Sequence, residues 1–141
     1  MLVGEVMSRN LRMVRTDQSV RDATAMMAEL NAGFLPVRDD SNNVVGAVTD
    51  RDIALRVVSV SKDSSTLVRD VMTRDVKCCY EDSDLFDVAQ EMAIHKLRRL
   101  AVLNRDKRMV GVITLGDLAR HEIGAAALAV AGVSVPDAPN C

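Results

Sequence analysis

The sequence has few aromatic residues: its 141 residues include two Phe, one Tyr and no Trp. A protein that binds single-stranded nucleic acid by stacking the bases would need more of them. Basic residues are not in excess either, because the formal net charge is −2. A general nucleic-acid binder usually carries a basic surplus. The composition therefore argues against nucleic acid as a partner.

Long apolar runs are missing too. A membrane-spanning helix needs about 18 consecutive apolar residues, and the nearest approach, the Ala-rich run Ile123–Val135, is too short. The N-terminus lacks the apolar stretch of a secretion signal. These absences argue against a membrane partner and predict a cytoplasmic protein.

The three cysteines, Cys78, Cys79 and Cys141, do not form a disulfide pattern, which fits a reducing compartment. The adjacent pair Cys78 and Cys79 could serve redox chemistry or bind metal. Because the pair lacks CxxC spacing and nearby ligands, side-chain packing in a strand is the favoured interpretation.

What the chain does contain is an internal repeat. A shift of 65 residues aligns Val3–Ile53 with Val68–Leu118 without a gap, and 14 of the 51 aligned pairs are identical. The identical pairs include a Val-Met dipeptide near the start of each copy and a Gly-x-x-Thr-x-x-Asp motif near its end. We therefore assign residues 1–60 to repeat 1, 61–67 to a polar linker, 68–124 to repeat 2, and 125–141 to a C-terminal helix extension and frayed tail.

Both copies predict the same order of elements, β-α-β-β-α, after a short helical turn that holds the Val-Met dipeptide. In copy one we expect strands over Leu11–Arg15, Phe34–Arg38 and Val44–Thr49, a helix over 20–30 capped by Asp17 or Ser19, and a last helix from Asp50. In copy two the strands are Val76–Tyr80, Arg99–Leu103 and Met109–Thr114, and the last helix starts at Leu115. One copy is too small to bury both faces of its sheet. The predicted fold class is α/β (α+β), with two tandem repeats packed sheet to sheet as one pseudo-two-fold module.

Some apolar residues lie off the main stripes of the helices, namely Ala25, Met26, Phe86, Ala93 and Leu97. A helix that is apolar on two sides needs a second partner, which indicates a homodimer. A wide intramolecular face is the alternative. In the tail, Leu118–Ala131 is expected to extend the last helix, and Gly132 is expected to end it.

The repeated motif occupies residues 46–52 and 111–117, where an apolar strand meets a helix. Thr followed three residues later by an acid is a capping box, so each motif can be a plain helix start. Capping does not explain the glycine, which in a strand often marks the close approach of a ligand or of another backbone. Amides at a helix start favour phosphate, and a carboxylate can accept from two vicinal hydroxyls such as those of ribose. A nucleoside-phosphate site is therefore the functional alternative.

The tandem units, the Val-Met-(Ser/Thr) openings and the twin motifs resemble a CBS domain pair, or Bateman module, of the stand-alone bacterial type, over roughly residues 1–125. The resemblance implies a regulatory sensor that binds AMP, ADP, ATP, S-adenosylmethionine or NAD in clefts between the two repeats. It implies no required cofactor, no metal site and no catalytic residue, and it leaves the downstream protein partner open.

The resemblance also assigns roles to residues. Ribose hydroxyls fall to Asp52 and Asp117, and ribose or phosphate contacts to Thr49 and Thr114, within motifs that begin at Gly46 and Gly111. The adenine is expected near Ser8 and Leu11, and near Thr73 and Val76. Phosphate contacts are expected from Arg98 and Arg99, for which an ordinary solvated strand edge is the alternative. Copy one has Gly33 and Phe34 at those two positions, and it carries Arg51 where copy two has Gly116, so the two clefts should differ in charge.

Two other functions compete with a sensor. The chain could be a dimeric scaffold with no physiological nucleotide ligand, in which the motifs act only as helix caps. It could also be an enzyme, but the sequence shows no nucleophile–base pair, metal cluster or glycine-rich phosphate loop. The sensor is the function that the repeated motif favours.

Overall fold

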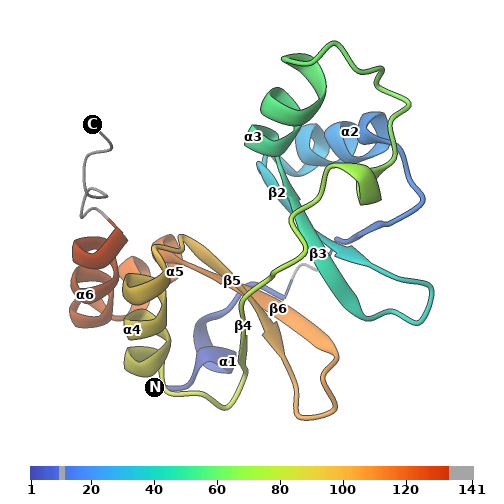
Figure 1. Cartoon of the computed structure of the whole chain (residues 1–141). Helices are drawn as coiled ribbons and strands as arrows, with labels where there is room; N and C mark the ends of the chain where they lie inside the picture. Colours follow the sequence, from blue (N-terminus) through green and yellow to red (C-terminus); the bar gives the residue numbers. More distant parts are fainter. Residues whose placement is uncertain (10–11, 134–141) are drawn as a thin grey trace. The chain divides into compact units, whose positions relative to one another are not determined.

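The computed structural model of the chain describes residues 1–9 and 12–133. It confirms a mixed α/β fold with two three-stranded sheets, ordered β1-β2-β3 and β4-β5-β6, each accompanied by helices (Figure 1). In each sheet the first pair of strands is parallel and the second is an antiparallel hairpin. Within the described residues, no helix is long and apolar enough to cross a membrane.

The bounds of the elements follow the prediction closely. In copy one they are α1 Val3–Val6, β1 Val14–Arg15, α2 Val20–Leu30, β2 Phe34–Arg38, β3 Val44–Thr49, α3 Asp50–Ile53 and the π-helical turn η1 Ala54–Val58. In copy two they are the 3-10 turn η2 Val68–Asp70, β4 Cys78–Tyr80, α4 Leu85–His95, β5 Arg99–Leu103, β6 Met109–Thr114, α5 Leu115–His121 and α6 Ile123–Val133. The first strand of each copy is shorter than expected, and Leu11, the predicted start of the first one, lies outside the described residues.

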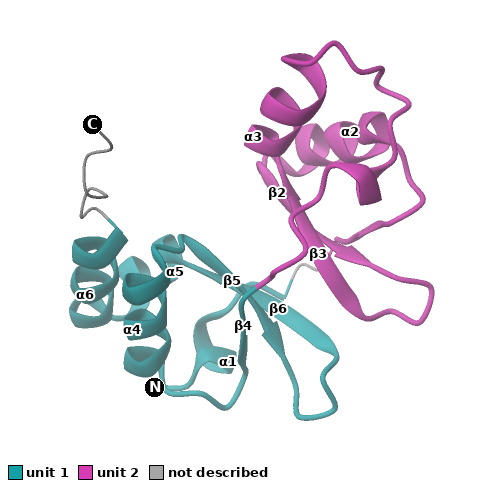
Figure 2. Ribbon diagram, viewed as in Figure 1, with its two compact units in different colours: residues 1–11, 77–141 teal, residues 12–76 magenta. Residues whose placement is uncertain are grey.

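The compact units of the structure do not coincide with the sequence repeats (Figure 2). Unit 1 contains residues 1–11 and 77–141, whereas unit 2 contains residues 12–76. Each unit therefore combines the body of one repeat with the leading segment of the other. We call residues 1–9 and 67–76 the leading segments.

Unit 1 has a core to which three parts of the chain contribute. The leading segment supplies Val3, Val6 and Met7, which are buried with the apolar side chains of β4–β6 and α4. The helix α6 packs on α4 and α5 and adds its small residues to the same core (Figure 1). The fully buried side chains of this core are Val3, Leu85, Ala89, Met92, Val102, Ile113, Leu118, Ala125 and Ala129.

Unit 2 repeats this construction without a counterpart of α6. Its core joins β1–β3, α2 and Val57 of η1 to Val68, Val71 and Met72 of the second leading segment. In unit 1, both cysteines lie in β4. The predicted packing in a strand is confirmed for Cys79, which is buried, whereas Cys78 is exposed. Burial of apolar surface stabilises a fold by about 25 cal/mol per Å². Each leading segment therefore contributes to the stability of the unit that it joins.

Backbone hydrogen bonds join each leading segment to the hairpin of its unit. Ser8 and Val112 exchange two of them, with N···O distances of 2.9 and 3.0 Å. Thr73 and Ala47 exchange the equivalent pair at 2.8 and 2.9 Å. Because 65 residues separate Ser8 from Thr73, the two junctions are copies of one arrangement.

The motif glycines make room for these crossings. A Cβ added to Gly111 would lie 2.7 Å from the carbonyl oxygen of Ser8 and 2.6 Å from the sulfur of Met7. A Cβ added to Gly46 would lie 2.8 Å from the carbonyl oxygen of Thr73 and 2.7 Å from the sulfur of Met72. Of the two explanations for the motif glycines, a ligand or another backbone, the structure shows another backbone, that of the leading segment.

Two expectations for the C-terminal helix are wrong. The helix is not continuous, because α5 ends at His121 and the backbone of Glu122 leaves the helical region before α6 begins. Gly132 lies inside α6 and does not end it. An added Cβ at Gly132 would overlap the Cβ of Ala93, so this glycine permits close contact between α6 and α4. The expected frayed tail, over residues 134–141, lies outside the described residues.

The off-stripe residues of copy two have an intramolecular explanation. Phe86 and Ala93 face Gly124 and Gly132 of α6, and Leu97 packs against the core of unit 1. For copy two, the wide intramolecular face is the better interpretation. At the start of α2, Ser19 and not Asp17 provides the cap, since its hydroxyl accepts from the backbone N–H of Asp22 at 3.1 Å.

We predict that Gly111→Ala destabilises the protein by about 1–3 kcal/mol, because the new methyl group collides with the backbone of Ser8. Gly116→Ala is the matched control, since its Cβ would meet no described atom closer than Arg120 Nη1 at 3.4 Å. That variant should be neutral or stabilised by up to about 1 kcal/mol through helix propensity. Urea unfolding measures both, and wild-type stability of Gly111→Ala would contradict the assigned contact.

A second prediction concerns alkaline pH. Burial, with the neighbouring Cys78 thiol, raises the pKa of Cys79 to about 12, whereas an unfolded thiol titrates near about 8.5. Between these two pKa values the Cys79 thiol ionises in the unfolded chain but not in the folded chain. The contribution of this thiol to the free energy of unfolding is therefore constant below about pH 8.5 and falls as the pH rises above it. Cys79→Ala should lose about 1–2 kcal/mol less than the wild type between pH 8 and 10.5 in urea unfolding. Equal slopes for Cys79→Ala and the wild type would contradict the raised pKa.

Candidate functional site

The candidate site of unit 1 lies where β6 meets α5. Thr114 occupies the cap position, and its Oγ1 accepts from the backbone N–H of Asp117 at 3.1 Å. In return, Asp117 Oδ2 accepts from the backbone N–H of Thr114 at 2.9 Å. The predicted capping box is therefore present, and it fixes the orientation of both side chains.

Asp117 is unusual in its burial. It is 4 % exposed, and among the described residues it is the one charged residue in the buried class. A buried carboxylate is costly unless it is paired and hydrogen-bonded. Asp117 has both kinds of partner, because its Oδ1 accepts from Nη2 of Arg120 while its Oδ2 serves the cap.

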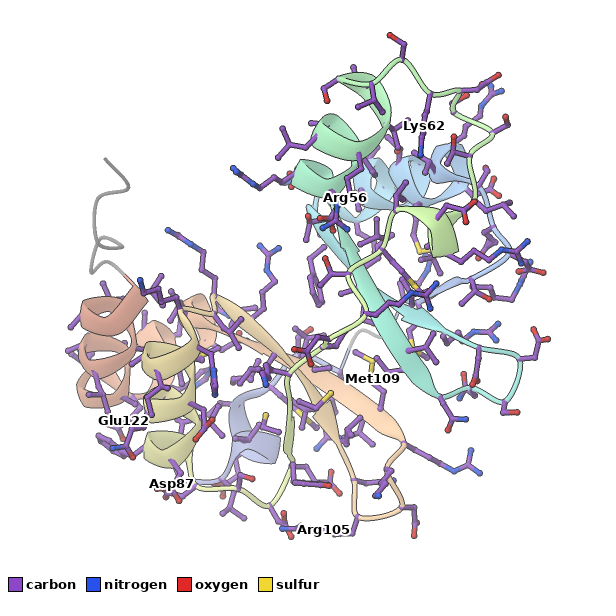
Figure 3. All side chains as sticks on the ribbon, in the orientation of Figure 1. Arg56, Lys62, Asp87, Arg105, Met109 and Glu122 are labelled. Atoms are coloured by element: carbon purple, nitrogen blue, oxygen red, sulfur yellow. The ribbon has the colours of Figure 1, made fainter. Side chains whose placement is uncertain are left out.

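The junction of β3 and α3 in unit 2 has the same geometry. Thr49 Oγ1 accepts from the backbone N–H of Asp52 at 3.1 Å, and Asp52 Oδ2 accepts from that of Thr49 at 3.0 Å. The Asp52 side chain is also largely buried, at 14 % exposed. Arg56 lies one helical turn further on, 3.9 Å from Asp52 Oδ1 (Figure 3).

Each leading segment brings residues of one repeat to the motif of the other. Ser8 pairs with Val112, two residues before Thr114, so the expected adenine position of copy one lies in unit 1 with Asp117. By the same crossing, Thr73 pairs with Ala47.

Val76 was expected, with Thr73, to lie near the adenine. It is half-buried and belongs to unit 2, as Asp52 does. Leu11 lies outside the described residues. Gly46 and Gly111 touch the leading segments, as described above.

The predicted arginines surround the junction of unit 1. Arg99 stands opposite Thr114 in the β5–β6 register, and the carbonyl of Arg98 accepts from the backbone N–H of Leu115 at 3.1 Å. Both side chains are exposed. The structure thus brings Arg98, Arg99 and Thr114 to one strand end.

Unit 2 has different residues at the equivalent positions. Phe34 stands opposite Thr49, and the carbonyl of Gly33 accepts from the backbone N–H of Asp50 at 3.0 Å. Arg51 is exposed, and its backbone N–H donates to Oδ1 of Asp50 at 2.8 Å. The two junctions therefore differ in charge, with arginines at the strand end of unit 1 and none at the strand end of unit 2.

The sequence analysis missed Arg56 and Arg120, the cations nearest to the motif carboxylates. Arg56 follows Asp52 by four residues and Arg120 follows Asp117 by three. Both spacings place side chains on one helix face, and this signal could have identified them. Elsewhere, the described part of the chain has no group of three or more His, Cys, Asp or Glu that could hold a metal ion.

The geometry of each junction can hold a hydroxylated ligand. A buried carboxylate faces a strand end where a foreign backbone crosses, and basic side chains lie nearby.

Comparison with known proteins places this geometry in a family. The family model described as CBS domain matches residues 3–59 and 68–124. The CBS domain-containing protein YhcV of Bacillus subtilis is 33% identical over 121 residues, which cover 86% of this chain and 85% of YhcV.

Solved structures agree with the fold. CBSX2, a CBS-pair protein of Arabidopsis thaliana solved in complex with AMP, is 30% identical with a TM-score of 0.73, over 87% of this chain and 96% of that one. The CBS domain pair of protein MJ0100, in complex with 5′-methylthioadenosine and S-adenosyl-L-methionine, is 27% identical with a TM-score of 0.76, over 85% and 98%. With two matching domains, twin capped junctions and these structural relatives, the chain belongs to the CBS domain family as a CBS domain pair.

Proposed function

We propose that this chain is a regulatory module that binds adenosine-containing ligands, one at the strand–helix junction of each unit. The observation that carries the proposal is the pair of carboxylates, the buried Asp117 and the largely buried Asp52, each held in one orientation by its cap. Relatives that share the fold were solved with AMP and with S-adenosyl-L-methionine. Both ligands contain a ribose diol, which is the group that such a carboxylate recognises.

The cap uses only one oxygen of each carboxylate, because Oδ2 accepts from the backbone of the capping Thr. Oδ1 of Asp52 lies 3.9 Å from Arg56, and Oδ1 of Asp117 accepts from Arg120. We place a ribose hydroxyl on Oδ1, with Thr49 or Thr114 beside the ribose or its phosphate. The adenine then lies against the leading segment, beyond Ser8 in unit 1 and toward Val76 in unit 2.

The charges near the two junctions support different ligands. Unit 1 presents Arg98 and Arg99, where unit 2 presents Gly33 and Phe34. Phosphate groups pair well with guanidinium groups. We therefore assign a phosphorylated nucleotide such as AMP, ADP or ATP to unit 1. Unit 2, whose exposed Arg51 lies next to Asp50, suits a less anionic adenosine derivative such as S-adenosylmethionine.

A cytoplasmic homodimer remains part of the proposal. In unit 2 a groove of about 480 Å³ lies between α2 and the turn η1, and Ala25, Ala28, Ile53 and Val57 contribute to its apolar lining. The equivalent face of α4 in unit 1 is covered by α6. An exposed apolar groove favours a protein partner, and a second copy of this chain is the partner that we propose.

The ribose contact is tested by Asp117→Asn. The amide group that replaces Oδ1 cannot accept from a hydroxyl, so AMP binding by calorimetry should weaken by about 1–3 kcal/mol. The preference for AMP over 2′-deoxy-AMP should fall as well. Asp52→Asn should act in the same way on the ligand of unit 2.

Asp106→Asn, an exposed carboxylate in the turn between β5 and β6, is the matched control and should bind AMP as the wild type does. Melting temperatures are measured for all variants, because the same carboxylates cap helices. Wild-type affinity and ribose preference in both Asp52→Asn and Asp117→Asn would favour the alternative, a dimeric scaffold without a nucleotide ligand.

A further inference from the structure

Both oxygens of the Asp117 carboxylate are hydrogen-bonded to groups of its own chain. Its Oδ2 accepts from the backbone of Thr114 at 2.9 Å, and its Oδ1 is in direct contact with Nη2 of Arg120. The side chain of Asp117 is 6 % exposed, whereas that of Arg120 is 65 % exposed. A largely exposed guanidinium therefore contacts the oxygen that the proposed function assigns to a ribose hydroxyl.

Unit 2 holds its arginine differently. Arg56 Nη1 donates to the carbonyl oxygens of Val71 at 2.8 Å and Met72 at 3.3 Å, so the guanidinium is anchored on the leading segment. It stays 3.9 Å from Asp52 Oδ1, which has no hydrogen bond among the described residues. Oδ1 of Asp52 therefore lacks the direct guanidinium hydrogen bond that Oδ1 of Asp117 has.

The difference arises from a shift of one residue. Copy one has Leu55-Arg56 where copy two has Arg120-His121. Arg120 lies in the α-helix α5, where its guanidinium contacts the carboxylate, whereas Arg56, one position later in the repeat, lies in the π-helical turn η1 and contacts the leading segment. The one-residue shift of the arginine does not affect capping, because both capping boxes have the same geometry.

We propose that Arg120 is a specificity-determining residue that makes ribose binding in unit 1 depend on a ligand phosphate. This inference rests on the proposed function. A ribose hydroxyl must take Oδ1 from Arg120, and a neutral donor replaces a charge-assisted hydrogen bond poorly. A ligand phosphate gives the displaced guanidinium a new anionic partner, whereas a nucleoside gives it none. AMP therefore recovers the lost contact, and adenosine does not.

The phosphate requirement is confined to unit 1. Ribose binding at Asp52 displaces no guanidinium, because Arg56 already rests on carbonyl oxygens of Val71 and Met72. A ligand shifts an equilibrium only through its different affinities for the two states. Phosphorylated and unphosphorylated adenosine ligands are thus distinguished by Arg120 and treated more evenly by unit 2.

The test compares AMP with adenosine by calorimetry in an Asp52→Asn background, in which unit 2 no longer competes. Arg120→Ala should lower the ratio of AMP affinity to adenosine affinity by about tenfold, through weaker AMP binding and equal or tighter adenosine binding. The charge-matched double variant Arg120→Leu/His121→Arg copies the Leu-Arg order of unit 2. It should lower the ratio to a similar extent, since it moves the guanidinium off Asp117 while keeping the net charge.

Arg108→Ala, an exposed arginine in the turn between β5 and β6, is the control and should leave the ratio unchanged. Wild-type selectivity in Arg120→Ala with AMP still bound overturns the role of Arg120 and leaves the proposed function standing. If Arg120→Ala changes the selectivity but the double variant does not, the preference for AMP depends on net charge, and this outcome also overturns the role of Arg120. Equal loss of AMP and adenosine binding indicates a purely structural role and contradicts the inference, and absence of any binding in the Asp52→Asn background overturns the site of unit 1 itself.

Discussion

The structure depends on an exchange of leading segments between the two repeats. Two reciprocal backbone pairs, Ser8 with Val112 and Thr73 with Ala47, attach each segment to the hairpin of the other copy. Glycine is required beneath each crossing, because a side chain at Gly46 or Gly111 would collide with the crossing backbone. The apolar residues that precede each crossing, Val3, Val6 and Met7 or Val68, Val71 and Met72, complete the core of the unit that receives the segment. Neither repeat by itself contains a complete unit.

This exchange also determines the composition of each candidate site. Repeat 2 supplies Thr114 and Asp117 of unit 1, and repeat 1 supplies the backbone around Ser8. A ligand held at such a junction would contact both repeats within one unit, so its binding would depend on the conformation of both repeats. That property suits a regulatory module. The exchange of leading segments gives the motif glycines a structural role. Recognition of a ligand is then a role for the carboxylates and the arginines.

Local features could be predicted from the sequence, and long-range features could not. The capping boxes at Thr49 and Thr114 depend on groups three residues apart, so their pattern is sufficient. The destination of a leading segment is different, because two similar repeats offer two similar sheets, and the apolar pattern of Val3–Val6 fits either. Gly132 resembled a helix end because its contact, Ala93, is distant in sequence. The roles of Arg56 and Arg120 depended on a shift of one residue, which a pattern of charges does not resolve.

The central claim is that AMP binds a junction built from both repeats. It is tested most directly by titrating AMP into isotopically labelled protein and following the backbone amide resonances. We expect the amides of Ser8, Thr114 and Asp117 to shift along one common binding isotherm, although more than 100 residues separate Ser8 from Thr114. Shifts confined to residues 68–121 without Ser8, or no shifts at millimolar AMP, would contradict the account.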